Sequence, residues 1–431
     1  MSRTGALWQR LRGSGAFGRV SRLASAAALA QGIHLAAAPF LTRWFEVAQI
    51  GAWTLFAATA ATVGTLATAR YEYAIVLPRR HADASHVLQL CLVVCAAVTL
   101  ATAVGVMVLS ALAPQATLVQ TLGPTLAWLP VAVAAAGITQ ALTLWHNRLG
   151  GFGAIARARI LGPVAVVGLQ ALAAVARWGT PGLVAAQALG VLAPPLSLWW
   201  ATRGGMRRRL PRWSWRRLRR TALQHRRFPL INTPHAFVNA LQETLAIATV
   251  AALAGVVAAG HFGLTMRLLR APASLVGGAV SEVLLSPLAR TWNDGGEIRP
   301  MLWRATRALG LVSLVPAALL LLGGPALFGW LLGDQWQVAG EYARWLVPYL
   351  MAHFIVGPLT IAPIVMNRQG TALCFSLVGN ALYVVALAAV LWAGGSLPHA
   401  LGVLSVVQVL YFAAYWRWLW SAARQPEAAH G

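Results

Sequence analysis

Twelve long apolar segments follow one another along the 431-residue chain, separated by short connections that carry polar residues, glycine or proline. A helix needs about 20 apolar residues to cross a bilayer. The pattern therefore predicts an all-α polytopic membrane protein with about twelve transmembrane helices. The predicted spans are residues 21–41, 48–69, 87–112, 124–145, 159–176, 182–201, 229–254, 259–285, 308–332, 345–366, 372–393 and 398–418.

The first apolar segment follows five arginines, an arrangement that also occurs in cleaved signal peptides. The basic stretch is long here, however, and the apolar run continues through Pro39 to Leu41. We expect this segment to be retained as the first span.

The positions of the arginines predict the orientation of the spans. Of 34 basic residues, all arginine, 29 fall at the termini or in every second connection, against three in the other connections. Basic residues concentrate on the cytoplasmic side of membrane proteins. Both termini are therefore expected in the cytoplasm.

Composition supports a membrane protein and removes one competing interpretation. Only 10% of the residues are charged and 58% are hydrophobic, whereas soluble proteins carry about 25% charged residues. A net charge of +24 would otherwise suggest nucleic-acid binding. Because the arginines flank apolar segments, orientation in the membrane explains them and no nucleic-acid partner is expected.

Eleven arginines lie in the sixth connection, residues 203–227, close to the middle of the chain. We expect this segment to be a basic cytoplasmic linker between two six-helix bundles, residues 1–202 and 228–431. Its interleaved Trp213 and Trp215 favour a segment that lies on anionic lipid over an RNA-binding patch.

A weak internal repeat fits this division into bundles. Shifting the chain by 212 residues sets Gly51 over Gly263, and Glu72 near Glu282. Some transporters consist of two such halves, related by a pseudo-two-fold axis along the membrane normal.

Two acidic residues and two arginines lie well inside predicted spans. Glu243 is 13 residues before the turn near Val256, while Arg267 and Arg270 are 11 and 14 residues after it. These three therefore share a depth of roughly 20 Å from the turn, and could pair or flank one cavity. A cation in a bilayer costs roughly 2.5–3.5 kcal/mol even on the mildest scale, so such residues indicate function. The fourth is Glu282.

Polar residues on span 7 form a stripe. Asn232, Asn239 and Glu243 are spaced by seven and four residues and therefore share one helical face. The stripe either holds the bundle together by interhelical hydrogen bonds or lines a water-filled surface that contacts substrate. The nearby arginines favour the second reading, because the planar guanidinium binds phosphate with two hydrogen bonds.

Other polar residues in the spans are interpreted as packing or interhelical hydrogen-bonding groups. Gln31 and His34 form a smaller pair, for which packing is at least as good an explanation as a site. The isolated residues of this kind are His235, His353, Asn380 and Gln408.

The sequence carries no motif of a soluble enzyme: no Walker A sequence, HExxH, CxxC or Asp-x-Asp. We therefore expect no catalytic residue, no metal site and no cofactor, and the protein is not expected to be an enzyme. A proton gradient or the membrane potential could drive transport, since one charge moved across 100 mV is worth ~2.3 kcal/mol. Glu243 or Glu282 would be the protonatable coupling group.

Residues 70–78, RYEYAIVLP, resemble the signature that follows span 2 in bacterial polysaccharide biosynthesis membrane proteins, the O-antigen flippase family. This family belongs to the multidrug/oligosaccharidyl-lipid/polysaccharide (MOP) exporter superfamily. Residues 30–53 look like its first span and the following loop, although Glu46-Val47-Ala48 replaces the usual proline-containing stretch. Residues 228–245 and 286–290 resemble its spans 7 and 8.

The resemblance implies a flippase in a bacterial inner membrane. Such a protein moves an oligosaccharide linked to isoprenoid pyrophosphate across the membrane by alternating access, for O-antigen, capsule or exopolysaccharide synthesis. The implied partners are this substrate, the bilayer and a polysaccharide polymerase with other assembly proteins. Candidate substrate-binding residues are Gln31, Arg43, Asn232, Asn239, Glu243, Arg267 and Arg270, and candidate gate or coupling residues are Arg70, Glu72 and Glu282.

Several alternatives remain open at this point. Arg70 and Glu72 either anchor the loop after span 2 or form a cytoplasmic gate that pairs and breaks during transport. The protein could be a drug or metabolite exporter of the same superfamily, but such a cavity should favour acids and aromatics over arginine. A polysaccharide polymerase or ligase is a third candidate, against which the short outward loops argue.

Overall fold

The computed structural model describes residues 15–202 and 214–424, and every regular element within them is helical. Twelve stretches of this described part are long and apolar enough to cross a membrane, and each overlaps one predicted span. The all-α polytopic class predicted from the hydrophobic pattern is therefore confirmed.

The helices form two compact units. The first unit contains Met1–Phe45 and Phe56–Ala240, and the second contains Glu46–Leu55 and Leu241–Gly431. Two helices, α3 (Val47–Gly64) and α11 (Thr233–Ala254), contribute to both units. The predicted boundaries at 202 and 228 stay a prediction, and residues 203–213 of the predicted linker lie outside the described residues.

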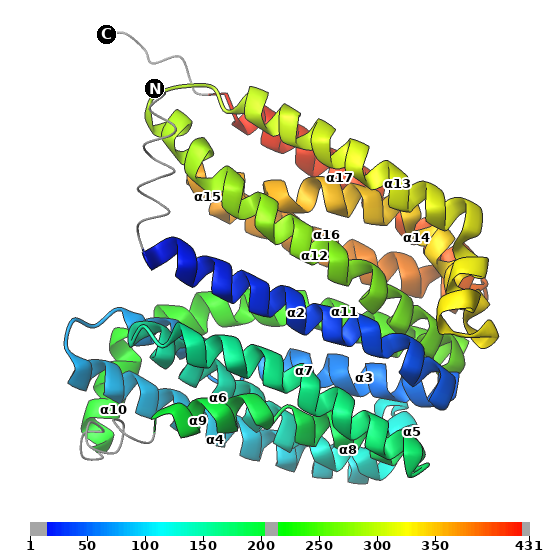
Figure 1. The fold of residues 1–431 in the computed structure, drawn as a ribbon, viewed down its shortest axis with the longest axis horizontal. Coiled ribbons are helices and arrows are strands. Elements are labelled where there is room, and N and C mark those ends of the chain that lie inside the picture. The colour runs from blue at the N-terminus through cyan, green and yellow to red at the C-terminus, as the bar shows by residue number, and fades with distance from the viewer. Residues whose placement is uncertain (1–14, 203–213, 425–431) are drawn as a thin grey trace. The chain divides into compact units, whose positions relative to one another are not determined.

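In the first unit, α2 packs against α7, and α4 packs against α6 and α10 (Figure 1). The core includes Tyr71, Leu88, Leu142, Trp145 and Leu218. The elements are α2 (Gly15–Trp44), α3 (Val47–Gly64), η1 (Tyr71–Val76), α4 (His81–Leu112), α5 (Thr117–Leu122), η2 (Gly123–Trp128), α6 (Leu129–Arg148), α7 (Phe152–Val175), α8 (Gly179–Gly190), α9 (Ala193–Thr202), α10 (Trp215–Gln224), η3 (Phe228–Asn232) and α11 (Thr233–Ala254).

In the second unit, α14 lies beside α12, α13 and α17, and α16 packs on α17 (Figure 1). The core includes Leu288, Leu302, Leu359, Tyr415 and Leu419. The elements are α12 (Val256–Asn293), α13 (Arg299–Leu332), η4 (Asp334–Trp336), α14 (Gln337–Val356), η5 (Gly357–Ile361), α15 (Ala362–Val365), α16 (Gln369–Trp392) and α17 (Leu397–Ala422).

Glycine determines how α11, α12 and the start of α3 meet. The chain reverses direction between α11 and α12 at Gly255. The φ angle of this residue is +91°, a backbone conformation that residues other than glycine rarely adopt. A Cβ on Gly51 would collide with the Val256 carbonyl oxygen, and one on Gly260 would collide with the Val47 carbonyl oxygen. The backbones of α3 and α12 therefore touch, which explains why Glu46–Leu55 belongs to the second unit.

Several predicted span boundaries differ from those of the structure; two of the differences have an identifiable reason, and one span is divided into two helices. The ninth span begins at Arg299 and not at 308, because its first turns carry arginines that a hydropathy pattern excludes. Helix α3 ends at Gly64 and not at 69, because residues 65–70 form turns, in which Ala69 and Arg70 adopt left-handed backbone conformations. The sixth span is broken between α8 and α9, next to Pro194 and Pro195.

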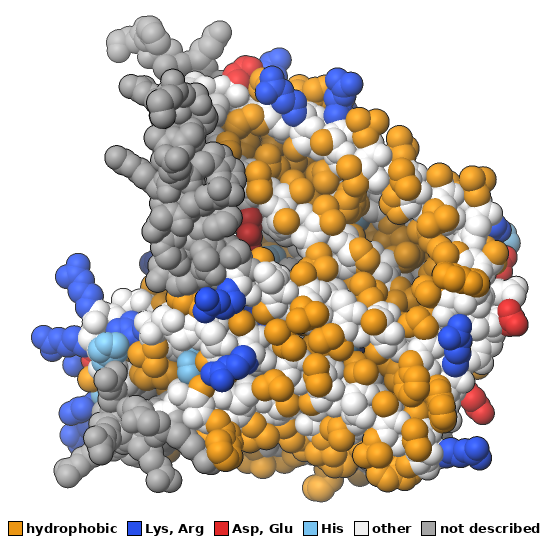
Figure 2. Space-filling view, in the orientation of Figure 1, with side chains coloured by type: hydrophobic (Ala, Val, Ile, Leu, Met, Phe, Trp, Pro, Cys, Tyr) orange, Lys and Arg blue, Asp and Glu red, His pale blue; other side chains and the backbone are white. Residues whose placement is uncertain are grey.

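Large apolar side chains are exposed along the outer faces of these helices. Examples are Leu100, Met107 and Leu112 on α4, and Val315 and Leu322 on α13. Figure 2 shows hydrophobic side chains over much of the visible helical surface. Soluble proteins rarely expose contiguous apolar patches of this kind, whereas lipid-facing helices require them. The chain is a multi-pass membrane protein.

Candidate functional site

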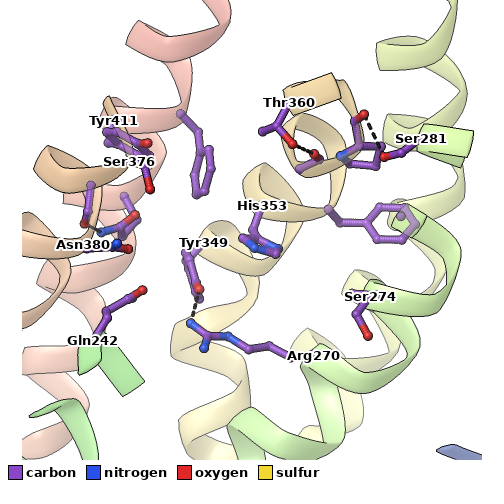
Figure 3. A pocket seen from close by; sticks show the side chains of 18 of the residues that line it. Gln242, Arg270, Ser274, Ser281, Tyr349, His353, Thr360, Ser376, Asn380 and Tyr411 are labelled. Carbon is purple, nitrogen blue, oxygen red and sulfur yellow. Dashed lines mark hydrogen bonds between the residues drawn. The ribbon is translucent and has the colours of Figure 1, made fainter. Parts of the chain in front are cut away.

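A cavity of about 480 Å³ lies inside the second unit, between α11, α12, α14, α16 and α17 (Figure 3). The polar residues lining it come from all five helices and from the adjoining η5. They are Gln242, Arg270, Ser274, Ser281, Tyr349, His353, Thr360, Ser376, Asn380, Gln408 and Tyr411. The sequence analysis identified four of these as polar residues within predicted spans: Arg270, His353, Asn380 and Gln408. It assigned only Arg270 to a site.

Arg270 is the one charged residue among the described residues that line this cavity. Its guanidinium donates a hydrogen bond from Nη2 to the hydroxyl of Tyr349 (Figure 3). The guanidinium carbon lies 5.7 Å from the ring centre of Tyr349 and 5.6 Å from that of Tyr383. Two tyrosines thus hold the cation through their ring faces and one hydroxyl.

The hydrogen-bonding capacity of Arg270 is only partly used. A guanidinium offers five N–H donors, and its buried Nε finds no acceptor within the described part of the chain. Nη1 lies 4.0 Å from Oε2 of Glu243, whose side chain is 52% exposed. Such an exposed pair is weak, so Arg270 retains donors for an anionic ligand.

Aromatic rings form one wall of the cavity. The ring of Tyr349 contacts those of Tyr383, His353 and Phe412, with centroid distances of 5.6, 5.9 and 6.4 Å. Tyr383 is buried, and its hydroxyl lies 4.0 Å from the sulfur of Met266. This packed wall fixes the position of the Tyr349 hydroxyl and hence of Arg270.

Amide side chains line other parts of the cavity. Gln242 extends from α11, and Asn380 from α16 (Figure 3). Gln408 is buried and donates from Nε2 to the Gly379 carbonyl at 3.0 Å. A cavity with one cation, several amides and hydroxyls, and an aromatic wall can bind a ligand that has both an anionic and a hydroxyl-rich part.

The expected proximity of Glu243 to the arginines is confirmed for Arg270, which lies beside it at 4.0 Å. Arg267 takes another direction and does not line the cavity. Its guanidinium carbon lies 4.5 Å from the ring centre of Trp53, a buried residue of α3. Depth along a helix predicts which residues share a level but not which side of the helix each faces.

The other candidate binding residues belong to the first unit. Gln31 is half-buried in α2, and Arg43 is exposed in the last turn of that helix. Asn232 and Asn239 are exposed, and the Asn239 amide nitrogen lies 3.1 Å from Nε2 of His235. Their proposed contact with substrate stays a prediction.

The RYE segment forms a tightly connected turn in the first unit. Glu72 is buried, accepts a short hydrogen bond from the Thr68 hydroxyl, and lies 3.6 Å from Arg70. Arg148 donates to the carbonyl oxygens of Ile75 and Val76 at 3.3 and 3.4 Å. Charged and backbone groups thus hold the whole segment, while its role as anchor or gate stays open.

Two further features of the site concern residues outside the cavity. Burial raises the pKa of Tyr71, and the nearby Cys91 raises it further by a smaller amount. The protonated hydroxyl of Tyr71 donates a hydrogen bond to the Ala222 carbonyl of α10 at 3.3 Å.

Glu282 on α12 is exposed, next to the cavity residue Ser281, and forms no ion pair within the described ranges. No cluster of three metal-binding side chains occurs among the described residues.

Comparisons with known proteins agree with this architecture. Residues 40–341 match the family described as polysaccharide biosynthesis protein. A search of curated protein sequences found no significant match.

Solved structures of transporters share the fold. The structure is similar to an inward-facing multidrug resistance MATE family transporter of the MOP superfamily, with 14% identity, a TM-score of 0.64, and coverage of 94% of this chain and 96% of the other. It is also similar to the lipid II flippase MurJ in an inward closed conformation, with 9% identity, a TM-score of 0.71 and coverage of 93% and 87%.

A third similar structure is a MOP superfamily transporter from Pyrococcus furiosus, described as having a binding pocket of reverse polarity. It is 14% identical, with a TM-score of 0.61 and coverage of 95% of this chain and 96% of the other. Because the sequence identities are this low, the three similarities show that the chain shares the fold of these transporters and do not show a shared substrate.

Proposed function

The chain belongs to the polysaccharide biosynthesis protein family, and we propose that it is a flippase for a lipid-linked oligosaccharide. The substrate would be a saccharide joined to an isoprenoid pyrophosphate, moved across a bacterial inner membrane by alternating access. The supply of O-antigen, capsule or exopolysaccharide precursors is the process that such transport serves.

The observation that carries the proposal is the partly satisfied Arg270 in a cavity lined by amides, hydroxyls and aromatic rings. A guanidinium with free donors suits a diphosphate, because charge-assisted hydrogen bonds to phosphate are short and strong. Amides and hydroxyls suit the hydroxyl groups of a sugar, and the apolar faces of sugar rings suit tyrosine. Together these groups match both parts of the proposed substrate.

The energy source is proposed to be an ion gradient or the membrane potential. The sequence carries no Walker A motif for ATP binding. Moving one charge across 100 mV supplies about 2.3 kcal/mol. Glu243, beside Arg270, is the carboxylate whose protonation would change the charge at the cavity most directly.

The direct test is depletion of the protein followed by analysis of membrane lipids. A lipid-linked saccharide should accumulate on the cytoplasmic leaflet, where it stays accessible to enzymes added to inside-out vesicles. An unchanged lipid-linked pool, with normal export of glycan, would contradict the proposal.

Replacing Arg270 tests the site itself. Arg270→Gln should abolish complementation of a flippase-deficient strain, because it removes the charge that binds phosphate. Arg270→Lys should restore part of the activity, since lysine keeps the charge but loses the bidentate geometry. The matched control is Arg290→Gln, an exposed arginine on the same helix. Arg267→Gln, alone and combined with Arg270→Gln, reports whether Arg267 contributes.

Membrane insertion of each variant is measured in parallel by protein abundance in the membrane fraction. Normal glycan export from a well-inserted Arg270→Gln protein would remove Arg270 from the site. Equal losses in Arg270→Gln and Arg290→Gln would point to a general need for charge.

A drug or metabolite exporter is the second candidate, favoured by structural similarity to a multidrug resistance transporter. The two candidates differ in the charge of the ligand. A cationic drug should be repelled by Arg270, whereas an anionic metabolite would bind. Thermal stabilisation of the purified protein by cationic drugs, with no effect of isoprenoid pyrophosphates, would favour the exporter.

A further inference from the structure

A second cavity, of about 660 Å³, lies in the first unit at the junction of the RYE segment, the start of α4, and α10. One wall is the connection from Leu77 to Arg80, and another is the face of α10 that carries Arg217, Arg220 and Gln224. Helix α10 is fixed in place by Leu218, which is buried in the core of the unit, and by the hydrogen bond from Tyr71 to Ala222.

Four arginines line this cavity, and one acidic residue faces them. Arg79 and Arg80 come from the connection, Arg217 and Arg220 from α10, and Asp83 from the first turn of α4. Within residues 15–202 and 214–424, none of the four guanidinium groups forms an ion pair with a carboxylate. The cavity therefore concentrates positive charge, with four arginines against the single carboxylate of Asp83 among the described residues that line it.

A buried histidine adds an independent sign of a missing ligand. His86 lines the cavity, is only 6% exposed, and has no hydrogen-bond partner for its Nε2 atom. A buried polar nitrogen left unpaired costs about 1–3 kcal/mol, so native proteins usually satisfy it. A ligand that accepts a hydrogen bond would satisfy this atom.

The backbone at this place favours the same kind of ligand. Helix α4 begins at His81, and Arg80, which caps it, makes no side-chain capping hydrogen bond. The unpaired N–H groups and the dipole at a helix N-terminus favour anions, phosphate above all. Burial lowers the pKa of His225, another lining residue, so at neutral pH the positive charge comes from the arginines.

We propose that this cavity binds a phosphate group, held by the four arginines, His86 and the N-terminus of α4. The cavity lies where α4 begins, and this helix, His81–Leu112, is long and apolar enough to cross a membrane. The phosphate could therefore belong to the headgroup of an anionic phospholipid or to a soluble phosphate. This site is separate from the Arg270 cavity and does not depend on the proposed transport function.

The test uses the purified full chain in neutral detergent, with three probes: dioctanoyl phosphatidylglycerol, inorganic phosphate, and dioctanoylglycerol, which lacks phosphate. Binding is measured by calorimetry. The cavity variant is Arg217→Gln/Arg220→Gln. Its matched control is Arg216→Gln/Arg219→Gln, two exposed arginines of the same helix that do not line the cavity. Arg79→Gln/Arg80→Gln tests the other wall.

We expect phosphatidylglycerol or inorganic phosphate to bind, and dioctanoylglycerol not to bind. Each cavity variant should weaken that binding by about tenfold or more, because two charge-assisted hydrogen bonds are lost, while the control stays close to the original protein. His86→Phe, which removes the nitrogen but keeps a ring, should weaken binding as well.

The probes also distinguish the two sources of phosphate. Binding of phosphatidylglycerol alone identifies a lipid headgroup, and comparable binding of inorganic phosphate identifies a soluble ligand; either result supports the site. Equal weakening by cavity and control variants would show diffuse attraction to basic residues and overturn the proposal, as would the absence of binding by both phosphate probes. Unfolding temperatures of all variants confirm that each one is folded.

Discussion

At the scale of single residues, the turn after α3 shows how local strain and a buried ion pair occur together. Ala69 and Arg70 both have positive φ, at 47° and 60°. Non-glycine residues held in this region cost of order 1–3 kcal/mol each, and persist where the surroundings fix them. Here the ion pair between Arg70 and the buried Glu72, together with the hydrogen bond from Thr68 to Glu72, holds the turn in this conformation.

Glu72→Gln should therefore destabilise the protein by about 1–3 kcal/mol, since Arg70 loses the charge that compensates it. The free energy of unfolding in detergent measures this change. The control is Glu46→Gln, an exposed glutamate with no ion pair among the described residues. If Glu72 is only an anchor, transport per folded molecule should persist; if it gates, transport should fall further than stability does. An unchanged stability would remove the pair from both roles.

Tyr71 allows a test by pH. Its pKa lies above the ordinary value of 10.0 because the side chain is buried. A raised pKa in the folded state means that the stabilisation is fully present below 10.0 and is lost as the pH rises above it. Tyr71→Phe should cost about 1 kcal/mol at pH 7, from the lost hydrogen bond to Ala222, and should flatten the decline in unfolding temperature between pH 9.5 and about 11. An equally steep decline in both proteins would contradict this.

At the scale of helices, the approach of α3 to α12 depends on two glycines. Gly260→Ala should destabilise the second unit by about 1–3 kcal/mol, because the added methyl group meets backbone atoms that cannot move aside. Gly278→Ala on the same helix is the control, since nothing lies within 4 Å of the added Cβ. Alanine there should be neutral or stabilise by about 0.5–1 kcal/mol. Equal unfolding temperatures for both variants would show that the contact is dispensable.

The helices could be predicted from the sequence because each spans a membrane-length apolar run. The pairing of Arg270 with Glu243 could also be predicted, since distance from a shared turn fixes depth. The aromatic support from Tyr349 and Tyr383 could not, because it depends on how α14 and α16 rotate toward α12. For the same reason His353, Asn380 and Gln408 were interpreted as isolated, although all three line one cavity with Arg270.

At the scale of the whole molecule, two carboxylates are candidates for coupling transport to an ion gradient. Glu243→Gln/Glu282→Gln should make transport independent of a pH gradient, since neither side chain can then carry a proton. Transport is followed in vesicles with and without an imposed gradient, and Asp294→Gln is the control. Full gradient-dependent transport by the double variant would exclude these residues as coupling groups.

The sharing of α3 between two units has a consequence for synthesis. Gly51 leaves the ribosome about 200 residues before Gly260, the residue whose backbone it must touch. At roughly 5–20 residues per second, this leaves the start of α3 without its partner for about 10–40 seconds. Synthesis of the first unit is therefore complete before the start of α3 can pack against α12. Chains whose synthesis is interrupted before α12 should expose the start of α3 to chaperones and proteases.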